Sequence, residues 1–416
     1  MYNQIPLLLL SLFFFSSCKT EKDNNVKPKP PIVIEEPQLN FPFPSHATYK
    51  AHLKPSASTE ELNKSTADFY DEWKKKYLVR GCGTSEYKVD YKNGETVSEA
   101  HGYGMMITVY MAGYDKNSKK YFDGLFKYFK SHASGINTKL MSWKQNSSCA
   151  NVDGNGSATD GDIDIAYALL LADKQWGSKS GIDYKNEAVN LINAIATSEI
   201  NKYRYNVTYG DWVKSSDSKF YNSTRSSDFI TGHFKSFGEV ADNNFWNSVV
   251  NKCYRITSDI QKNYSSKTGL MPDFMVNTNG NVKPAPSGHL EGPNDGAYYY
   301  NACRFPWRIG TDYLISGDSR AKTALSKINN WLVSSTVNDP TKIVDGYKLD
   351  GSKIASWSDA AFVAPFAVSA MVGNDQKWMD DIYNYTESMD INDGEYYENS
   401  IKMLCMLVLS ENFWTP

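Results

Sequence analysis

The feature that most constrains the fold of this chain is the alternation between two kinds of helical segment. Residues 98–113 and 162–175 are apolar on nearly all sides, whereas residues 57–77 and 184–196 are amphipathic. A helix that is apolar all round must be surrounded by other elements, while an amphipathic helix can line an exterior. Buried and exterior helices in alternation therefore predict an all-α toroid, in which helical hairpins build two concentric rings.

Further helical segments continue this pattern and are separated by loops rich in Gly, Asn, Asp and Ser. They cover residues 239–263, 302–316, 319–334, 360–372, 375–385 and 396–411. Alternating strand patterns are scarce, and short strands are expected only in residues 203–213 and 343–354. No second linker or low-complexity break follows residue 45, so we expect one domain over residues 45–416.

The first 44 residues are expected to be a targeting segment and a tether. The apolar run IPLLLLSLFFFSSC is too short to span a bilayer comfortably and ends in small residues and Cys18. Residues 1–18 resemble a bacterial lipoprotein signal, in which the cysteine becomes the lipidated first residue. Residues 19–44 are polar and proline-rich, which is typical of a semi-extended tether. A plain secretory signal is the alternative, because no Lys or Arg precedes the apolar run.

The composition excludes one class of partner and permits another. The formal net charge is −3, so the chain has no basic field with which to hold nucleic acid. Aromatic residues make up 14% of the chain. Most of them are expected to build the core, but Tyr and Trp also combine a flat apolar face with a polar edge, which suits sugar rings.

No metal or other cofactor is expected. Five of the six cysteines follow Cys18, and they are scattered without a CxxC pair or a metal-ligand spacing. Because their number is odd, at least one thiol must remain free. The oxygen-rich stretch 153–164 is spaced somewhat like a calcium loop, but Ala158 stands where an EF-hand requires Gly.

Acidic residues stand at the head of two of the apolar segments. Glu99 follows Ser98, a good helix N-cap, and a second cluster led by Asp160 follows the cap-like Thr159. An acid in the first turn of a helix can simply complement the helix dipole. Carboxylates at the ends of two buried helices are costly, however, unless those ends face a solvated cleft.

Several stretches of the chain resemble those of glycoside hydrolase family 8, whose members cleave β-1,4-linked glycans. The signature segments are SEAHGYGMM (98–106) and ATDGDIDIAYALLLADKQW (158–176), and the second fits the family pattern A-[ST]-D-[AG]-D…A…[FW]. The resemblance continues through LMSWKQNSS (140–148), TGLMPDF (268–274), LEGPNDGAYYYNACRFPWRIGTDYL (290–314) and YYENSIKML (396–404). It implies an (α/α)6 barrel, which agrees with the helix pattern.

The resemblance also implies catalytic roles. Glu99 matches the general acid, which protonates the leaving glycosidic oxygen, and Asp160 matches the carboxylate that binds and distorts the sugar at the cleavage point. The family inverts the anomeric configuration, so a third carboxylate must activate water from the opposite face of the ring. A helix N-terminus lowers the pKa of a carboxyl group, and a nearby ionised Asp160 would raise the pKa of Glu99 again.

The chain departs from many relatives at the position of the catalytic base. The largest subfamily carries the base as the Asp of a Tyr-Asp-Ala-x-Arg stretch, but Asn301 occupies that position here and an amide cannot accept a proton from water. A second subfamily has the same Asn and a Glu ten residues upstream, which corresponds to Glu291. We therefore predict Glu291 as the base, with Asp295 of the same loop as the alternative. If Glu291 and Asp295 are only surface acids, the enzyme has Asn301 in place of the usual base and is either inactive or uses a different group as its base.

Four further residues are candidates for substrate binding. Tyr103 and Trp143 have aromatic faces suited to sugar rings, although core packing explains them equally well. Arg304 follows Asn301 and is expected to hold a carboxylate or the loop that carries the catalytic water. His101 is expected either to hydrogen-bond the substrate or to have a structural role.

We therefore expect a monomeric, inverting endo-β-glycanase on a bacterial envelope, with a polysaccharide as its partner and a lipid anchor as its only membrane contact. If Cys18 is not lipidated, the enzyme is expected to be secreted. β-Glucan is favoured as substrate because no dense acidic run suggests a surface for polycationic chitosan. A chitosanase is the chief alternative within the class and a xylanase the next. A catalytically inactive glycan-binding lipoprotein is the alternative from another class.

Overall fold

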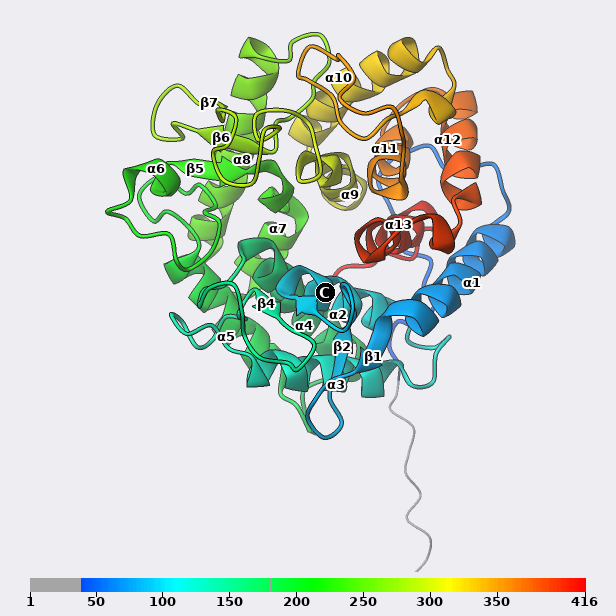
Figure 1. Cartoon of the computed structure of the whole chain (residues 1–416). Helices are drawn as coiled ribbons and strands as arrows, with labels where there is room; N and C mark the ends of the chain where they lie inside the picture. The colour runs from blue at the N-terminus through cyan, green and yellow to red at the C-terminus, as the bar shows by residue number, and fades with distance from the viewer. Residues whose placement is uncertain (1–38, 180) are drawn as a thin grey trace, which may run out of the picture. The chain divides into compact units, whose positions relative to one another are not determined.

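Helices form two concentric rings in residues 39–179 and 181–416, which are the residues that the computed structural model describes. The inner ring consists of α2 (Ser98–Tyr110), α4 (Thr159–Trp176), α7 (Thr231–Val240), α9 (Phe305–Ser316), α11 (Ala360–Met371) and α13 (Tyr396–Leu409). Each inner helix contacts the next and α13 contacts α2, so the ring is closed (Figure 1). Cys18, the predicted signal segment and most of the predicted tether lie outside the described residues.

Each inner helix is covered by one helix of the outer ring. The outer helices are α1 (Thr59–Tyr77) on α13, α3 (Ser118–Ser131) on α2, α5 (Tyr184–Ser198) on α4, α8 (Asn243–Asn263) on α7, α10 (Ser319–Thr336) on α9 and α12 (Gln376–Ser388) on α11. Because the first helix of the chain packs on the last, the two ends of the folded chain close the barrel. The predicted (α/α)6 barrel is confirmed.

The burial of the helices follows the sequence pattern. Every residue of α2 except Glu99 is buried, and so is every residue of α11. The outer helix α1 buries only one face, which includes Leu62, Phe69 and Trp73. Inner helices are thus buried on all sides, whereas an outer helix keeps one face in solvent. Among the described residues, no helix is both long enough and apolar enough to cross a membrane.

Two helices of the double ring were not predicted from the sequence. α3 was missed altogether, and α7 contains two glycines, Gly232 and Gly238, which weaken helix propensity. Packing against α4, α8 and α9 holds α7 in place. The single helix predicted over 239–263 is wrong at its start, because the chain breaks at Ala241 and Asp242 caps α8 by accepting the Phe245 N–H at 3.1 Å.

The strands are short and pair antiparallel. β1 (Leu78–Arg80) pairs with β2 (Tyr87–Val89), β3 (Thr96–Val97) with β4 (Lys144–Gln145), and β6 (Phe274–Val276) lies between β5 (Ser223–Arg225) and β7 (Lys283–Pro284). The remaining elements are the short helix α6 (Ser218–Tyr221) and the 3-10 turns Ser226–Asp228, Ala302–Arg304, Pro340–Lys342 and Ile391–Asp393.

The two strands expected from the sequence do not form. Residues 203–213 take part only in an isolated bridge between Ile200 and Val207, and residues 343–354 only in isolated bridges of Tyr347. In residues 203–213, a side chain instead of a neighbouring strand satisfies a backbone group. Asn206 Nδ2 donates to the Ser223 carbonyl at 3.1 Å. Side chains that satisfy backbone groups in this way compete with regular pairing.

Residues 40–53 run across the end of the barrel where the inner helices terminate. Carbonyl groups at a helix C-terminus lack partners within the helix. Backbone N–H groups of this strap donate to such carbonyls of five inner helices, in the pairs Asn40–Gln175, Phe43–Ala112, Ala47–Glu411, Lys50–Leu314 and Leu53–Met371. Phe41 also stacks on Trp414 with ring centroids 4.6 Å apart. The folded domain therefore begins before the predicted boundary at residue 45, because these backbone and aromatic contacts hold residues 40–44.

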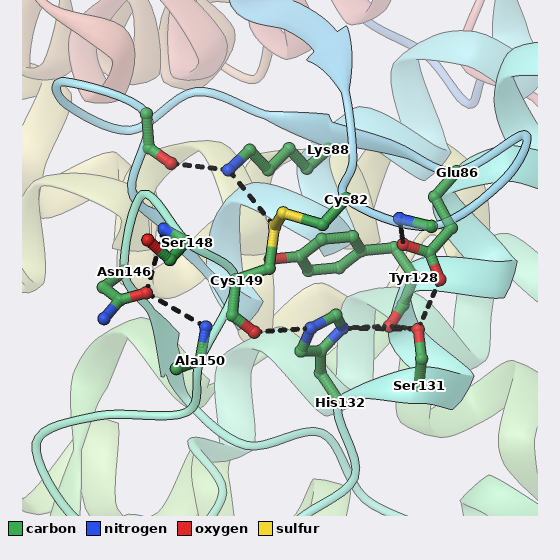
Figure 2. Close-up of a disulfide and its surroundings, with 12 residues drawn as sticks. Cys82, Glu86, Lys88, Tyr128, Ser131, His132, Asn146, Ser148, Cys149 and Ala150 are labelled. Carbon is green, nitrogen blue, oxygen red and sulfur yellow. Dashed lines mark hydrogen bonds between the residues drawn. A yellow bond between two sulfur atoms is a disulfide. The ribbon is translucent and has the colours of Figure 1, made fainter.

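Cys82 and Cys149 form a disulfide that joins the β1–β2 turn to the loop after β4. Figure 2 shows that His132 reaches the same loop: its Nε2 lies 2.9 Å from the Cys149 carbonyl oxygen and its Nδ1 lies 2.8 Å from the Tyr128 carbonyl oxygen. The pairing was left open by the sequence. The other cysteines of the described residues, Cys253, Cys303 and Cys405, are buried free thiols.

A buried acidic pair joins α4 to the end of α5. The carboxyl groups of Asp162 and Glu199 interact with each other, and both side chains are fully buried. Asp162 Oδ1 accepts the Met141 N–H at 2.9 Å, and Glu199 Oε1 accepts the Ser157 hydroxyl. Burial raises the pKa of both acids well above the usual range, and the charge of Asp162 raises the pKa of Glu199 further.

We predict that this pair makes the protein less stable as pH rises. Above the pKa of an unfolded Glu, the folded pair holds a proton that the unfolded chain releases, so the free energy of unfolding falls by up to about 1.4 kcal/mol per pH unit. Glu199→Gln removes one titrating group and should flatten this slope in urea unfolding between pH 5 and 8. The exposed Glu60 provides a matched control, Glu60→Gln. Equal slopes for the wild type and Glu199→Gln would refute the shared proton.

Candidate active site

A cavity of about 380 Å³ opens at the end of the barrel where inner helices begin. Residues singled out in the sequence that line it are Glu99, Trp143, Asp160, Glu291, Asn301 and Arg304. Helix N-termini carry partial positive charge and favour carboxylates. The cavity is therefore a place where buried helix ends and acidic side chains stabilise each other.

The helix starts differ from the predicted caps. α2 begins at Ser98 and α4 at Thr159, so the cap positions belong to Val97 and Ala158, which have no side chain able to cap. Strand β3 leads directly into α2, and the Ser98 N–H donates to the Trp143 carbonyl at 2.9 Å. Ser98 and Thr159 are therefore buried first-turn residues, and their predicted capping role is wrong.

Close packing of the two helix starts brings the acids together. A Cβ atom at Gly161 would lie 2.5 Å from Ser98 Oγ, so only glycine fits at this position. Glu99 and Asp160 consequently face the same cavity, although 61 positions separate them in the sequence. The side chain of Glu99 is 16% exposed and that of Asp160 is 4% exposed.

Arg304 connects the acids across the cavity. Its Nη1 donates to Glu99 Oε2 at 2.5 Å and to Asp160 Oδ2 at 2.8 Å. Its Nη2 donates to Asn301 Oδ1 at 3.0 Å. Arg304 is only 2% exposed, so these charge-assisted hydrogen bonds lie in a poorly solvated place, where they are strong. The expectation that Arg304 holds a carboxylate agrees with these contacts.

The two acids have opposite electrostatic environments. Burial opposes the ionisation of Asp160, but Arg225, whose Nη2 lies 3.0 Å from Asp160 Oδ1, and Arg304 together hold the pKa of Asp160 well below its usual range. Burial raises the pKa of Glu99, and the charge of Asp160 adds to this effect against the opposing charge of Arg304. Burial therefore contributes more to the raised pKa of Glu99 than the Asp160 charge on which the sequence argument relied.

Asn301 lies between Arg304 and Glu291. Its Nδ2 donates to Glu291 Oε2 at 2.8 Å, while its Oδ1 accepts from Arg304. Because Arg304 can only donate, the amide has a single favourable orientation, with its NH2 group toward Glu291. Glu291 itself is exposed at the cavity.

Asp295 does not line the cavity. It is 3% exposed, and its carboxylate accepts the backbone N–H groups of Leu290 at 2.7 Å, Glu291 at 3.1 Å and Gly292 at 2.8 Å. The alternative base of the sequence analysis is thus engaged in shaping the loop that carries Glu291.

The remaining candidates divide into one cavity residue and two buried ones. Trp143 is half-buried and lines the cavity. Tyr103 is fully buried beneath Arg304, which donates to its hydroxyl at 3.2 Å, so its ring cannot reach a sugar. His101 is also fully buried and stacks on Tyr128 with ring centroids 4.8 Å apart. The expectation that Tyr103 or His101 contacts substrate is wrong, because helix α2 buries both side chains.

Three residues of the site were not found from the sequence. Tyr396 donates its hydroxyl to Glu99 Oε1 at 2.5 Å, and Arg225 contacts Asp160 from a segment without a recognisable motif. Asp273 lies behind Asn301, where its Oδ1 accepts the Ala302 N–H at 2.7 Å, and burial raises its pKa to about 7. Tyr396 and Asp273 lie in quoted segments, but nothing in one sequence ranks them above their neighbours.

The acids of the cavity are not arranged as a metal site. Within residues 39–179 and 181–416, no three His, Cys, Asp or Glu side chains are placed to hold a metal ion. The cations that face Glu99 and Asp160 are arginines instead. Among the acids around this single cavity, Glu99 favours its proton, Asp160 is held ionised and Glu291 is exposed.

Comparison with known proteins identifies the family to which this chain is similar. The family model described as "Glycosyl hydrolases family 8" matches residues 41–411. A beta-glucanase of Niallia circulans is 48% identical over 380 residues, which cover 90% of this chain and 92% of the relative. An endoglucanase of Bacillus sp. strain KSM-330 is 38% identical over 390 residues, which cover 90% of this chain and 82% of the relative.

Solved structures share the fold. The apo structure of a beta-1,3-1,4-glucanase from Paenibacillus sp. X4 matches with a TM-score of 0.88 and 47% identity, over 91% of this chain and 100% of that one. Rex8A from Paenibacillus barcinonensis, complexed with xylose, matches with a TM-score of 0.73 and 18% identity over 86% of this chain and 94% of that one, which shows the fold alone. The chain belongs to glycoside hydrolase family 8 and is a glycoside hydrolase.

Proposed function

We propose that this protein is an inverting endo-β-glucanase that hydrolyses β-1,4 linkages in mixed-linkage β-1,3-1,4-glucan or in β-1,4-glucan. The observation that carries the proposal is the placement of Glu99 and Glu291 on one cavity. Glu99 lies in the first turn of α2, whereas Glu291 lies in the loop between β7 and α9 and accepts from Asn301, just before α9. α9 stands opposite α2 in the closed ring of six. An acid and a base on opposite sides of a cleft suit a single displacement by water.

Each group of the cavity has a role in this mechanism. Glu99 is protonated before the reaction, as its raised pKa favours, and gives its proton to the leaving glycosidic oxygen. Glu291 takes a proton from the water that attacks the anomeric carbon, and the Asn301 amide orients it. Asp160 remains ionised between two arginines and stabilises the positive charge that develops on the sugar ring.

The substrate assignment comes from the relatives, which are named beta-glucanase, endoglucanase and beta-1,3-1,4-glucanase. A panel of lichenan, carboxymethylcellulose, chitosan and xylan, assayed for new reducing ends, tests it. We expect the highest rate on lichenan or carboxymethylcellulose, and inverted α-anomeric products by NMR. A higher rate on chitosan or xylan than on the two glucans would contradict the assignment of β-glucan as the substrate. Binding of glucan without release of reducing ends on any polysaccharide would support the inactive glycan-binding alternative.

We predict that Glu291→Gln lowers kcat on lichenan by about 100-fold or more, because water then has no general base. Glu60 is an exposed acid on the outer helix α1, so Glu60→Gln is the control and should stay within about twofold of wild type. KM and thermal unfolding should change little in either variant. Unchanged turnover in Glu291→Gln would eliminate Glu291 as the base.

We also propose that Cys18 carries a lipid that anchors the enzyme to the bacterial envelope. The packed chain begins beside Gln175 at the end of α4, whereas Asp160 at the start of α4 lines the cavity. These points are 15 residues apart, or about 23 Å along the helix. The described chain therefore begins at the end of the barrel opposite the cavity.

Membrane fractionation of the full chain tests the anchor. Wild type is expected in the membrane fraction and to incorporate labelled palmitate, whereas Cys18→Ala is expected in the soluble fraction with unchanged activity on soluble glucan. A wild-type protein that is processed and released without label would favour the secretory alternative.

A further inference from the structure

The order of the inner helices gives three opposed pairs across the cavity, α2 with α9, α4 with α11 and α7 with α13. α2 stands opposite α9, and this line carries Glu99 and Glu291. α4 stands opposite α11, and Figure 1 shows these helices on facing sides of the ring. An acid and a base must approach a glycosidic bond from its two sides, so the sugar chain runs across the line that joins them. Two lines then remain, α4 to α11 and α7 to α13, and the first has a tryptophan just before the start of one helix, Trp357, and another in the loop that leads to the other, Trp143.

Trp143 stands at the α4 side of this line. It belongs to the loop between α3 and α4, and its carbonyl accepts from Ser98 at the start of α2. Its indole N–H donates to the Asp153 carbonyl at 2.9 Å, which fixes the ring. The ring lines the cavity together with Ala158, which directly precedes α4.

A second tryptophan, Trp357, stands on the α11 side. It lies three residues before α11 and is 59% exposed, although no other Trp is among the exposed large hydrophobic residues of the described chain. Its indole approaches the hydroxyl of Tyr300, a residue that lines the cavity. Glu398 lines this cavity and also a smaller neighbouring one, which Ser358 lines as well, and Ser358 directly follows Trp357.

The segment that carries Trp357 is firmly held. The Asp345 N–H donates to the Trp357 carbonyl at 2.9 Å, and the Asp359 N–H donates to Asp345 Oδ1 at 2.9 Å. The Tyr300 hydroxyl lies within 3.0 Å of Asp345 Oδ2 and 3.1 Å of Asp359 Oδ2. The backbone of Trp357 is thus fixed while the residue stays 59% exposed, so its ring is open to a ligand.

We propose that Trp357 forms the platform of a sugar subsite at the α11 end of the cleft, where it stacks on a glucosyl unit several residues along the chain from the cleaved bond. The proposal rests on the proposed function, since it takes the orientation of the glycan from Glu99 and Glu291. The flat face of an indole matches the C–H face of a β-linked glucosyl ring. With Trp143 at the other end of the cleft, the enzyme would bind a segment of the glycan that is longer than the cavity. Cleavage within a polymer requires such binding on both sides of the cleaved bond.

Substrates of different length test this subsite. Trp357→Ala should raise KM on lichenan and on cellohexaose about tenfold, the effect of losing one stacked aromatic face, while kcat/KM on cellotriose changes less than twofold. Trp357→Phe keeps an aromatic face and should recover most of the loss. Tyr114, an exposed aromatic residue after the end of α2 and far from the cavity, provides the control Tyr114→Ala, with no dependence on length.

A binding measurement separates this proposal from the proposed function. In the Glu99→Gln background, calorimetry with cellohexaose should show about tenfold weaker binding when Trp357→Ala is added, and no difference with cellotriose. The same loss for long and short ligands, or no loss for either, would overturn the subsite. Failure of the wild type to hydrolyse any β-glucan would instead overturn the proposed function, and the calorimetric comparison would still decide whether Trp357 contacts the glycan.

Discussion

The cavity depends on the buried guanidinium group of Arg304. Two carboxylates, Glu99 and Asp160, accept hydrogen bonds from the same Nη1 atom, and a third polar partner, Asn301, accepts from Nη2. Burying two acids side by side without a cation would cost several kcal/mol, since each charge loses its hydration. Arg304 offsets this cost. Arg225, which contacts Asp160, favours the ionised form of Asp160. One acid is thereby held ionised while its neighbour favours its proton.

The double ring explains why this arrangement sits at one end of the barrel. The inner helices run in the same direction, so their N-termini meet at the cavity and their C-termini meet at the strap of residues 40–53. Unpaired N–H groups and positive dipole ends favour acids at the first end. Unpaired carbonyls at the other end require donors, which the strap backbone supplies. The fold thus separates a chemically active end from one that is closed by hydrogen bonds.

The sequence predicted the parts of this protein that depend on local pattern. Helices that are apolar all round are inner helices, and the acids Glu99 and Asp160 stand in their first turns at the cavity. Burial within a helix cannot be told from burial against a ligand by pattern alone, which is why Tyr103 and His101 were misjudged. Contacts between distant segments, such as Arg225 with Asp160, leave no local signal at all. The helix α7 forms despite two glycines because tertiary packing overrides propensity.

The amide at position 301 and the acid at position 291 depend on each other. Asn301 Nδ2 donates to Glu291 Oε2 at 2.8 Å, and the same amide accepts from Arg304 through Oδ1. An aspartate at this position would keep the contact with Arg304 but would set a second carboxylate against Glu291, where like charges oppose ionisation. An aspartate at 301 would therefore have to hold a proton to keep the contact with an ionised Glu291. The neutral amide of Asn301 donates to Glu291 without needing that proton, so the missing carboxylate at 301 favours an ionised acid at 291.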